Sequence, residues 1–119
     1  MRDHTKLRAF ELADQLALAT YGCTSRFPRE EQFGLTSQMR RAAVSVPSNI
    51  VEGKSRNTQK EFKHFLFIAR GSAEELGYFL LLAKDLGYLD IKTFDELSDN
   101  CVHISSMLSS LISKIKNDL

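Results

Sequence analysis

Apolar residues recur at steps of three and four residues along almost the whole chain. One example starts at Phe62 and continues through Leu66, Ala69 and Ala73. Because an α-helix has 3.6 residues per turn, this spacing places the apolar side chains on one helical face. No window long enough to judge alternates in the way that a half-buried β-strand does. The sequence therefore predicts an all-α protein.

Turn and capping residues divide this pattern into four helices, expected at about residues 5–24, 35–54, 58–86 and 91–117. The turn Arg26-Phe27-Pro28 ends the first helix. Thr58 and Glu61 have the spacing of a capping box at the start of the third, Gly87 stops that helix, and Asp90 can cap the fourth. Long amphipathic helices with short connections predict a single domain over residues 1–119, an antiparallel up-down-up-down four-helix bundle.

Each helix is expected to place one apolar stripe in the core. The expected buried positions are Ala9, Leu12, Leu16, Ala19 and Cys23 in the first helix; Leu35, Met39, Ala42, Val46, Ile50 and Gly53 in the second; Phe62, Leu66, Ala69, Ala73, Leu76, Leu80 and Ala83 in the third; and Phe94, Leu97, Cys101, Ile104, Leu108, Leu111 and Ile115 in the fourth. The stripe of the fourth helix alternates three- and four-residue steps, as a coiled-coil seam does.

The third helix carries more apolar residues than one bundle face can bury. Those away from its core stripe are Phe67, Ile68, Tyr78, Phe79 and Leu82. An exposed apolar patch on a small protein marks an interaction surface. We therefore expect a homo-oligomer.

Small residues also gather in this helix, at Ala69, Gly71, Ser72, Ala73 and Gly77. A glycine inside a helix costs about 1 kcal/mol relative to alanine, so something must compensate. Close approach of another helix is one interpretation, and close approach of a ligand is the other.

Charge is distributed unevenly, although the formal net charge is only +1. Seven basic residues lie between positions 40 and 70 against two acidic ones, a net charge of +5, and residues 71–100 carry a net charge of −5. One interpretation is that these segments form ordinary solvated helix faces that pair with each other within or between chains. The other is that the basic segment forms a polyanion-binding face.

Residues for catalysis or metal binding are not assembled in this sequence. Glu61 and His64 form a single Glu-x-x-His pair, where a carboxylate di-iron bundle needs two. Cys23 and Cys101 are too far apart for a metal motif and read as buried thiols in a reducing compartment. We expect no enzyme activity, no cofactor and no metal site. Without a signal peptide or a membrane-spanning run, the expected location is the cytoplasm, away from membranes.

The segment from Arg40 to Gly53 combines features that folding alone does not require. It has paired arginines, Pro47 inside a predicted helix, and Asn49 and Glu52 in its second half. Pro47 should bend or loosen the helix, because it lacks a backbone donor. One interpretation makes Arg41 and Glu52 partners in an interhelical ion pair. The other makes this an exposed polar surface that holds phosphate or a partner's polar groups.

These residues resemble a known bacterial family. The similarity lies in four segments and two supporting marks, which are residues 38–53, Arg56, 62–65 and 68–76, with Phe27-Pro28-Arg29-Glu30-Glu31 and Gly87-Tyr88-Leu89. Together they resemble the four-helix-bundle proteins encoded in intervening sequences of 23S ribosomal RNA genes. This resemblance implies a barrel-like homopentamer without known catalytic activity. The family is also similar to the accessory variability proteins of diversity-generating retroelements, which bind their reverse transcriptase and nucleic acid through a basic surface.

The resulting hypothesis is a non-enzymatic, homo-oligomeric bundle that binds RNA, DNA or a reverse-transcriptase-like protein through its basic segment. The alternative is a structural protein–protein interaction scaffold without nucleic-acid affinity. The candidate binding residues are Arg40, Arg41, Asn49, Glu52, Arg56, Lys60, Lys63 and Arg70. The further motif positions, with expected structural roles, are Pro47, Gly53, Gly71, Ser72 and Glu75.

Overall fold

A computed structural model describes residues 4–115. Its helices are α1 (His4–Thr24), the short 3₁₀ helix η1 (Arg29–Glu31), α2 (Leu35–Lys54), α3 (Gln59–Asp85) and α4 (Ile91–Lys114). No strand occurs among the residues described, and the all-α prediction is confirmed. The first three long helices lie within one residue of their expected bounds. The fourth ends at Lys114, and residues 116 and 117 of its expected span lie outside the described range.

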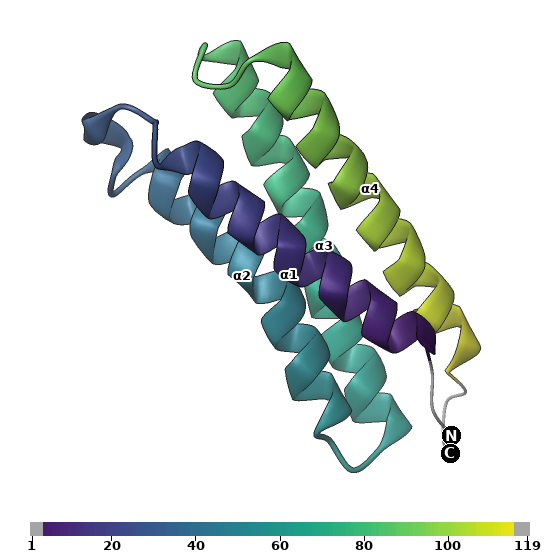
Figure 1. Ribbon diagram of the computed structural model, residues 1–119. Helices are drawn as coiled ribbons and strands as arrows, with labels where there is room; N and C mark the ends of the chain where they lie inside the picture. The colour runs from purple at the N-terminus through teal and green to yellow at the C-terminus, as the bar shows by residue number, and fades with distance from the viewer. Residues whose placement is uncertain (1–3, 116–119) are drawn as a thin grey trace.

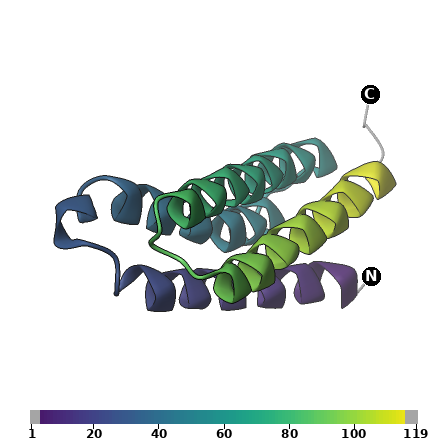
Figure 2. The ribbon, with the colours of Figure 1, turned by 90° about the horizontal axis from the view of Figure 1, so that it is seen from above.

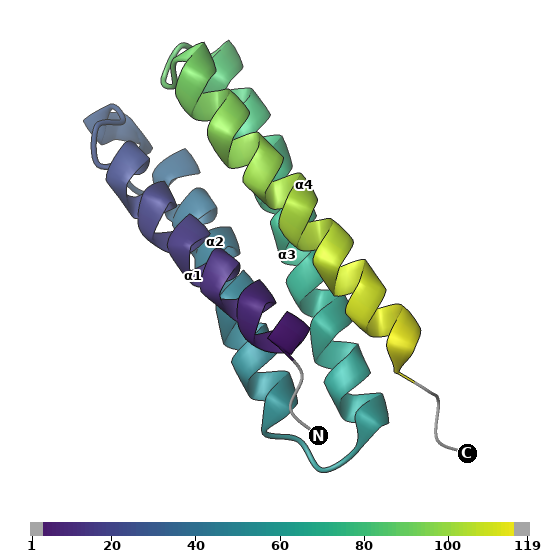
Figure 3. The same ribbon diagram turned by 45° about the vertical axis from the view of Figure 1, so that its right-hand side comes forward.

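The four long helices pack side by side into an elongated bundle of 49 × 25 × 19 Å (Figure 1). Contacts join α1 to α2, α2 to α3, α3 to α4 and α4 to α1, and no diagonal pair is in contact in the part of the chain described here. Figure 3 shows α1 beside α2 and α3 beside α4. The α2–α3 turn lies at one end of the bundle (Figure 1), and the connection containing η1 projects at the other end (Figure 2).

Local signals in the sequence set the helix ends. The hydroxyl of Thr58 accepts a hydrogen bond from the backbone N–H of Glu61, and the carboxylate of Asp90 accepts one from Thr93. The bond from Thr93 lowers the pKa of Asp90, because it favours the charged carboxylate. Gly87 has a φ of +85°, the left-handed conformation that glycine adopts without steric cost. These three predictions are confirmed.

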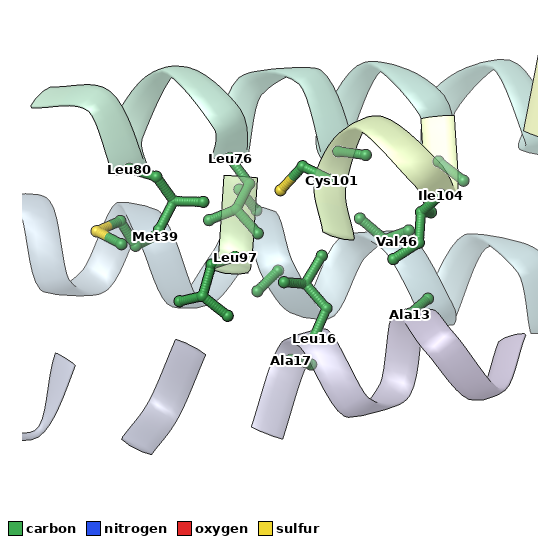
Figure 4. Close-up of a cluster of buried hydrophobic side chains, with 14 of the residues drawn as sticks. Ala13, Leu16, Ala17, Met39, Val46, Leu76, Leu80, Leu97, Cys101 and Ile104 are labelled. Carbon is green, nitrogen blue, oxygen red and sulfur yellow. The ribbon is translucent and has the colours of Figure 1, made fainter. Parts of the chain in front are cut away.

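The core lies along the bundle axis and receives side chains from all four helices (Figure 4). Every residue of the stripes predicted for α2 and α3 is buried. In α4, Leu97, Cys101 and Ile104 are buried, whereas Phe94 and Ile115 at its two ends are half-buried. The 3.6-residue pattern therefore identified the core faces of these helices.

In α1 the predicted stripe was partly wrong. Ala19 is exposed and Leu12 is half-buried, while Ala13, Ala17 and Thr20 are buried. Thr20 can enter the core because its hydroxyl donates to the carbonyl of Leu16 at 2.8 Å, which satisfies its polar group inside the helix. A polar residue thus occupies the place that the hydrophobic pattern assigned to Ala19.

Some of the apolar residues of α3 outside its core stripe remain exposed on the outer face of the helix. Phe67 is 45% exposed, Ile68 38% and Tyr78 58%, and Leu81 belongs to the same surface with 40%. Phe79 and Leu82, also counted in the surplus, instead pack partly against the core. None of the helices within residues 4–115 is long and apolar enough to cross a membrane.

Candidate functional site

Arg40 holds the first two helices together. Its Nε donates to the hydroxyl of Thr24 at 2.9 Å, and Nη2 donates to the carbonyl of Tyr21 at 3.4 Å. The guanidinium carbon lies 4.5 Å from the centre of the Tyr21 ring, within cation–π range. Arg40 therefore places a cation at the C-terminal end of α1, where carbonyls lack helical partners. The structure thus gives this candidate binding residue contacts inside the subunit.

Asn49 is also half-buried and bonded inside the subunit. Its amide nitrogen donates to the carbonyl of Ser45 at 2.7 Å and to the Ser45 hydroxyl at 2.9 Å. The same hydroxyl lies 2.7 Å from that of Ser72 on α3. Residues from two separate parts of the family resemblance thus form one short polar network between α2 and α3.

Pro47 and Gly53 serve packing within α2. The helix continues through Pro47, which is buried. A Cβ atom on Gly53 would stand 2.8 Å from Cδ1 of Phe62 and 3.0 Å from Cβ of Phe65. Since these separations are shorter than van der Waals contact, only glycine lets α3 approach so closely.

The ion pair considered between Arg41 and Glu52 is not formed. Glu52 pairs with Arg56 at 2.8 Å, one turn further along the chain. Within residues 4–115, Arg41 has no ion pair or hydrogen bond, and it is exposed. The two residues lie about three turns apart on α2, and in the described residues neither forms an ion pair with another helix.

Two other candidate cations, Arg70 and Lys63, are less accessible to a ligand because they are half-buried. Arg70 is half-buried, its Nη1 donates to the Ser109 hydroxyl at 3.0 Å, and its guanidinium lies 5.0 Å from the centre of the Phe67 ring. Lys63 is half-buried as well. Arg70 therefore links α3 to α4.

Cations gather instead around the α2–α3 turn, where Lys54, Arg56 and Lys60 are exposed and Lys6 is half-buried. Two adjoining hollows there share Arg56 and are bordered by Lys6, Lys54 and Lys60. Lys6 belongs to the first turns of α1, near the N-terminus, and its Nζ lies 4.7 Å from the centre of the Phe62 ring on α3. We call these four residues, Lys6, Lys54, Arg56 and Lys60, the turn surface. Sequence reasoning missed Lys6, because only the packing of α1 brings it here.

Only part of the charge segregation along the sequence persists in the fold, because Arg40 and Arg41 lie near the start of α2, at the end of the bundle away from the turn surface. At 1.5 Å per residue, the 27 residues of α3 span about 40 Å, from the turn surface to the α3–α4 connection. Beyond that connection, α4 begins with the acidic residues Asp95, Glu96 and Asp99, all exposed. Figure 1 shows the two connections at opposite ends of the bundle.

The run of small residues in α3 has two kinds of members. Ala69 and Ala73 are buried in the core, whereas Gly71 is exposed. A Cβ atom on Gly71 or Gly77 would meet no atom within 4 Å. Close packing inside the subunit therefore does not explain either glycine. Glu75, the last of the motif positions, is exposed and borders a hollow between α2 and α3.

Both cysteines are buried with free thiols, as predicted. Burial raises the pKa of the Cys101 thiol to about 12, and it also raises the pKa of Cys23. A raised pKa keeps a thiol protonated and unreactive at neutral pH. Within the described residues, His, Cys, Asp and Glu side chains form no group of three or more that could hold a metal ion.

Comparisons with known proteins agree with the fold and with the motif. The sequence pattern of the 23S rRNA-intervening sequence proteins matches residues 5–110. No match is found among functionally curated proteins. Among solved structures, the chain is similar to a protein of unknown function from the S23 ribosomal protein family of Bacteroides thetaiotaomicron. The TM-score is 0.86 at 21% identity, over 92% of this chain and 99% of that one, which shows a shared fold. The resemblance inferred from the motifs is confirmed, and because the match covers most of the chain, the protein belongs to the 23S rRNA-intervening sequence protein family.

Proposed function

We propose that this chain is a non-enzymatic subunit of a homo-oligomer, an antiparallel up-down-up-down bundle that binds RNA or another polyanion at the turn surface. The convergence of Lys6, Lys54, Arg56 and Lys60 at one end of the bundle carries this proposal. Phosphate contacts supply most of the affinity of sequence-independent nucleic-acid binding, and exposed lysines and arginines make those contacts.

The turn surface is a better candidate than the whole basic segment. Arg40 and Arg70 already make hydrogen bonds within the subunit, so redirecting them to phosphate would break those bonds. Within the turn surface Arg56 is paired with Glu52, but Lys54 and Lys60 are exposed and have no ion pair within residues 4–115. A phosphate can therefore approach them without displacing an internal partner.

The test is RNA binding measured by fluorescence anisotropy over a series of salt concentrations. Affinity for RNA falls as the salt concentration rises. Each lost phosphate contact should make the slope of log affinity against log salt concentration shallower by about 0.7 to 0.9. We expect the double variant Lys54→Ala/Lys60→Ala to bind more weakly and to show the smaller slope. No binding by the native chain at low salt would contradict the proposal.

Arg29→Ala/Lys92→Ala is the matched control. It also removes two exposed cations, but from the opposite end of the bundle. It should leave affinity and slope close to those of the native chain. Equal losses in both double variants would point to general charge attraction rather than to the turn surface.

The exposed apolar face of α3 favours a second candidate, a protein–protein interaction scaffold without nucleic-acid affinity. Phe67, Ile68 and Tyr78 lie on it, beside the unoccupied space around Gly71. Large apolar patches mark interaction surfaces, and a second copy of this chain is the partner that the family resemblance favours, in a pentamer. A native mass of one subunit at micromolar concentration would contradict self-association. Self-association together with absence of RNA binding would favour the scaffold.

A further inference from the structure

A groove runs across α2 near its N-terminal end, distant from the turn surface. Its larger part, about 630 Å³, lies between Tyr21 at the end of α1 and Phe33 in the connection that follows η1. A second part of about 510 Å³ continues from Phe33 towards α3 and ends beside Glu75. Arg41 borders both parts. About 13 residues of helix, or about 20 Å, separate Arg41 from Lys54.

Among the described residues, Phe33 is the most exposed large apolar side chain, at 90%. Its segment is nevertheless held at a neighbouring residue. One carboxylate oxygen of Glu31 accepts a hydrogen bond from the backbone N–H of Leu35, and the other accepts one from the hydroxyl of Tyr88. These bonds anchor the backbone beside Phe33, and the exposed ring offers a flat apolar surface at the border of the groove.

The larger part of the groove is bordered by cations and by no anion. Arg40 and Arg41 are its charged residues, and Arg41 is exposed without an internal hydrogen bond or ion pair in the described chain. Ser37, Ser45 and Ser48 also line this part of the groove, and the hydroxyl of Ser45 is bonded to Ser72 and Asn49. An exposed aromatic ring, a free guanidinium and several hydroxyls match the parts of a nucleotide: the base, the phosphate and the sugar.

We infer that this groove binds an unpaired segment of nucleic acid, with one base stacked on Phe33 and a neighbouring phosphate on Arg41. The choice of ligand class rests on the proposed function, but the site is separate from the turn surface. A base within a duplex has its faces covered by its neighbours, so the groove should select single strands over double strands. An acidic peptide could bind Arg41 but would not need to stack on Phe33.

The sequence supplies a direct reporter for stacking, because it contains no tryptophan. Phe33→Trp places a single indole in the groove and keeps an aromatic ring there. We expect a short unstructured RNA oligonucleotide to quench its fluorescence, and the same strand annealed to its complement to quench it much less. Tyr78→Trp is the matched control, since Tyr78 is also exposed but lies on the outer face of α3. Its fluorescence should change little.

Two further variants test the assignment of each group. Phe33→Ala should weaken single-strand binding about 5- to 150-fold, the loss expected for one aromatic–base stack of 1–3 kcal/mol. It should leave the melting temperature unchanged, because the ring is exposed. Arg41→Ala in the Phe33→Trp background should abolish quenching at concentrations where the parent is saturated.

The inference is overturned if the RNA strand binds without quenching Phe33→Trp, if an acidic peptide quenches it equally, or if duplex and single strand behave alike. Its failure is distinguishable from failure of the proposed function. Binding that depends on Lys54 and Lys60 but not on Phe33 supports the turn surface alone. Quenching that survives Lys54→Ala/Lys60→Ala supports the groove alone.

Discussion

The hydroxyls of Ser45 on α2 and Ser72 on α3 lie 2.7 Å apart and form a hydrogen bond between the two helices that carry the family's sequence motifs. Asn49 donates to the same Ser45 hydroxyl. Ser45 and Ser72 are both half-buried. Loss of the Ser72 hydroxyl therefore removes one of the two side-chain hydrogen bonds of the Ser45 hydroxyl and leaves the one from Asn49.

Ser72→Ala should lower the free energy of unfolding by about 0.5–1.5 kcal/mol, the net contribution of one such hydrogen bond. Urea denaturation measures this change. Ser106→Ala, at an exposed position of α4, is the control and should change stability by less than about 0.5 kcal/mol. If the double variant Ser45→Ala/Ser72→Ala lost the full sum of the single losses, the two hydroxyls would not be coupled.

Gly53→Ala should destabilise the protein by about 1–3 kcal/mol, because its Cβ would overlap Phe62 and force side chains or helices apart. The measurement is the midpoint of denaturant unfolding. A shift in this midpoint reports a change in stability when the dependence of the unfolding free energy on denaturant concentration is unchanged. Partial rescue by Phe62→Leu, which removes the overlapping ring, would support the packing explanation. Unchanged stability in Gly53→Ala would show that α3 yields freely.

Gly71→Ala should have the opposite effect on the subunit. The new methyl group meets no atom, and alanine favours a helix over glycine by about 0.5–1 kcal/mol. Thermal unfolding of dilute protein should show a higher melting temperature. If the outer face of α3 joins subunits, the same variant should shift the native mass towards smaller species. A raised melting temperature with an unchanged mass would separate Gly71 from the subunit contact.

Arg40→Ala should destabilise the fold by about 1–3 kcal/mol, because it leaves the Thr24 hydroxyl and the end of α1 without this cation. Arg41→Ala, its immediate neighbour, should stay within about 0.5 kcal/mol of the native chain. Chemical denaturation of both variants measures the contrast. Equal losses at the two positions would refute the division into a structural and a free arginine.

Cys101 should make stability fall at high pH. Its pKa is about 12 in the folded chain and near the ordinary 9.0 when unfolded. Its contribution is therefore complete below pH 9 and is lost as the pH rises from about 9 towards 12, where the unfolded chain releases its proton first. Cys101→Ala should show a shallower decline over this range in denaturation series. A thiol reagent should label Cys101 at pH 8 only after unfolding, and rapid labelling of the folded chain would contradict its burial.

Helix positions, caps and most of the core were determined by the sequence itself, since spacing and capping act over a few residues. The stripe from Phe62 to Ala83 and the stop at Gly87 depend only on neighbours along the chain. The burial of Thr20 was not predicted from the hydrophobic pattern, because it relies on the hydrogen bond from the Thr20 hydroxyl to the carbonyl of Leu16.

Only the tertiary structure decided what each candidate site residue does. Arg40 and Arg41 are adjacent and chemically identical, yet the register of α2 against α1 turns one onto Thr24 and leaves the other exposed. Packing also brings Lys6 to the α2–α3 turn and Phe33 to the groove beside Arg41. These relationships join residues of different helices and connections, and they arise from how whole helices pack, which local periodicity does not encode.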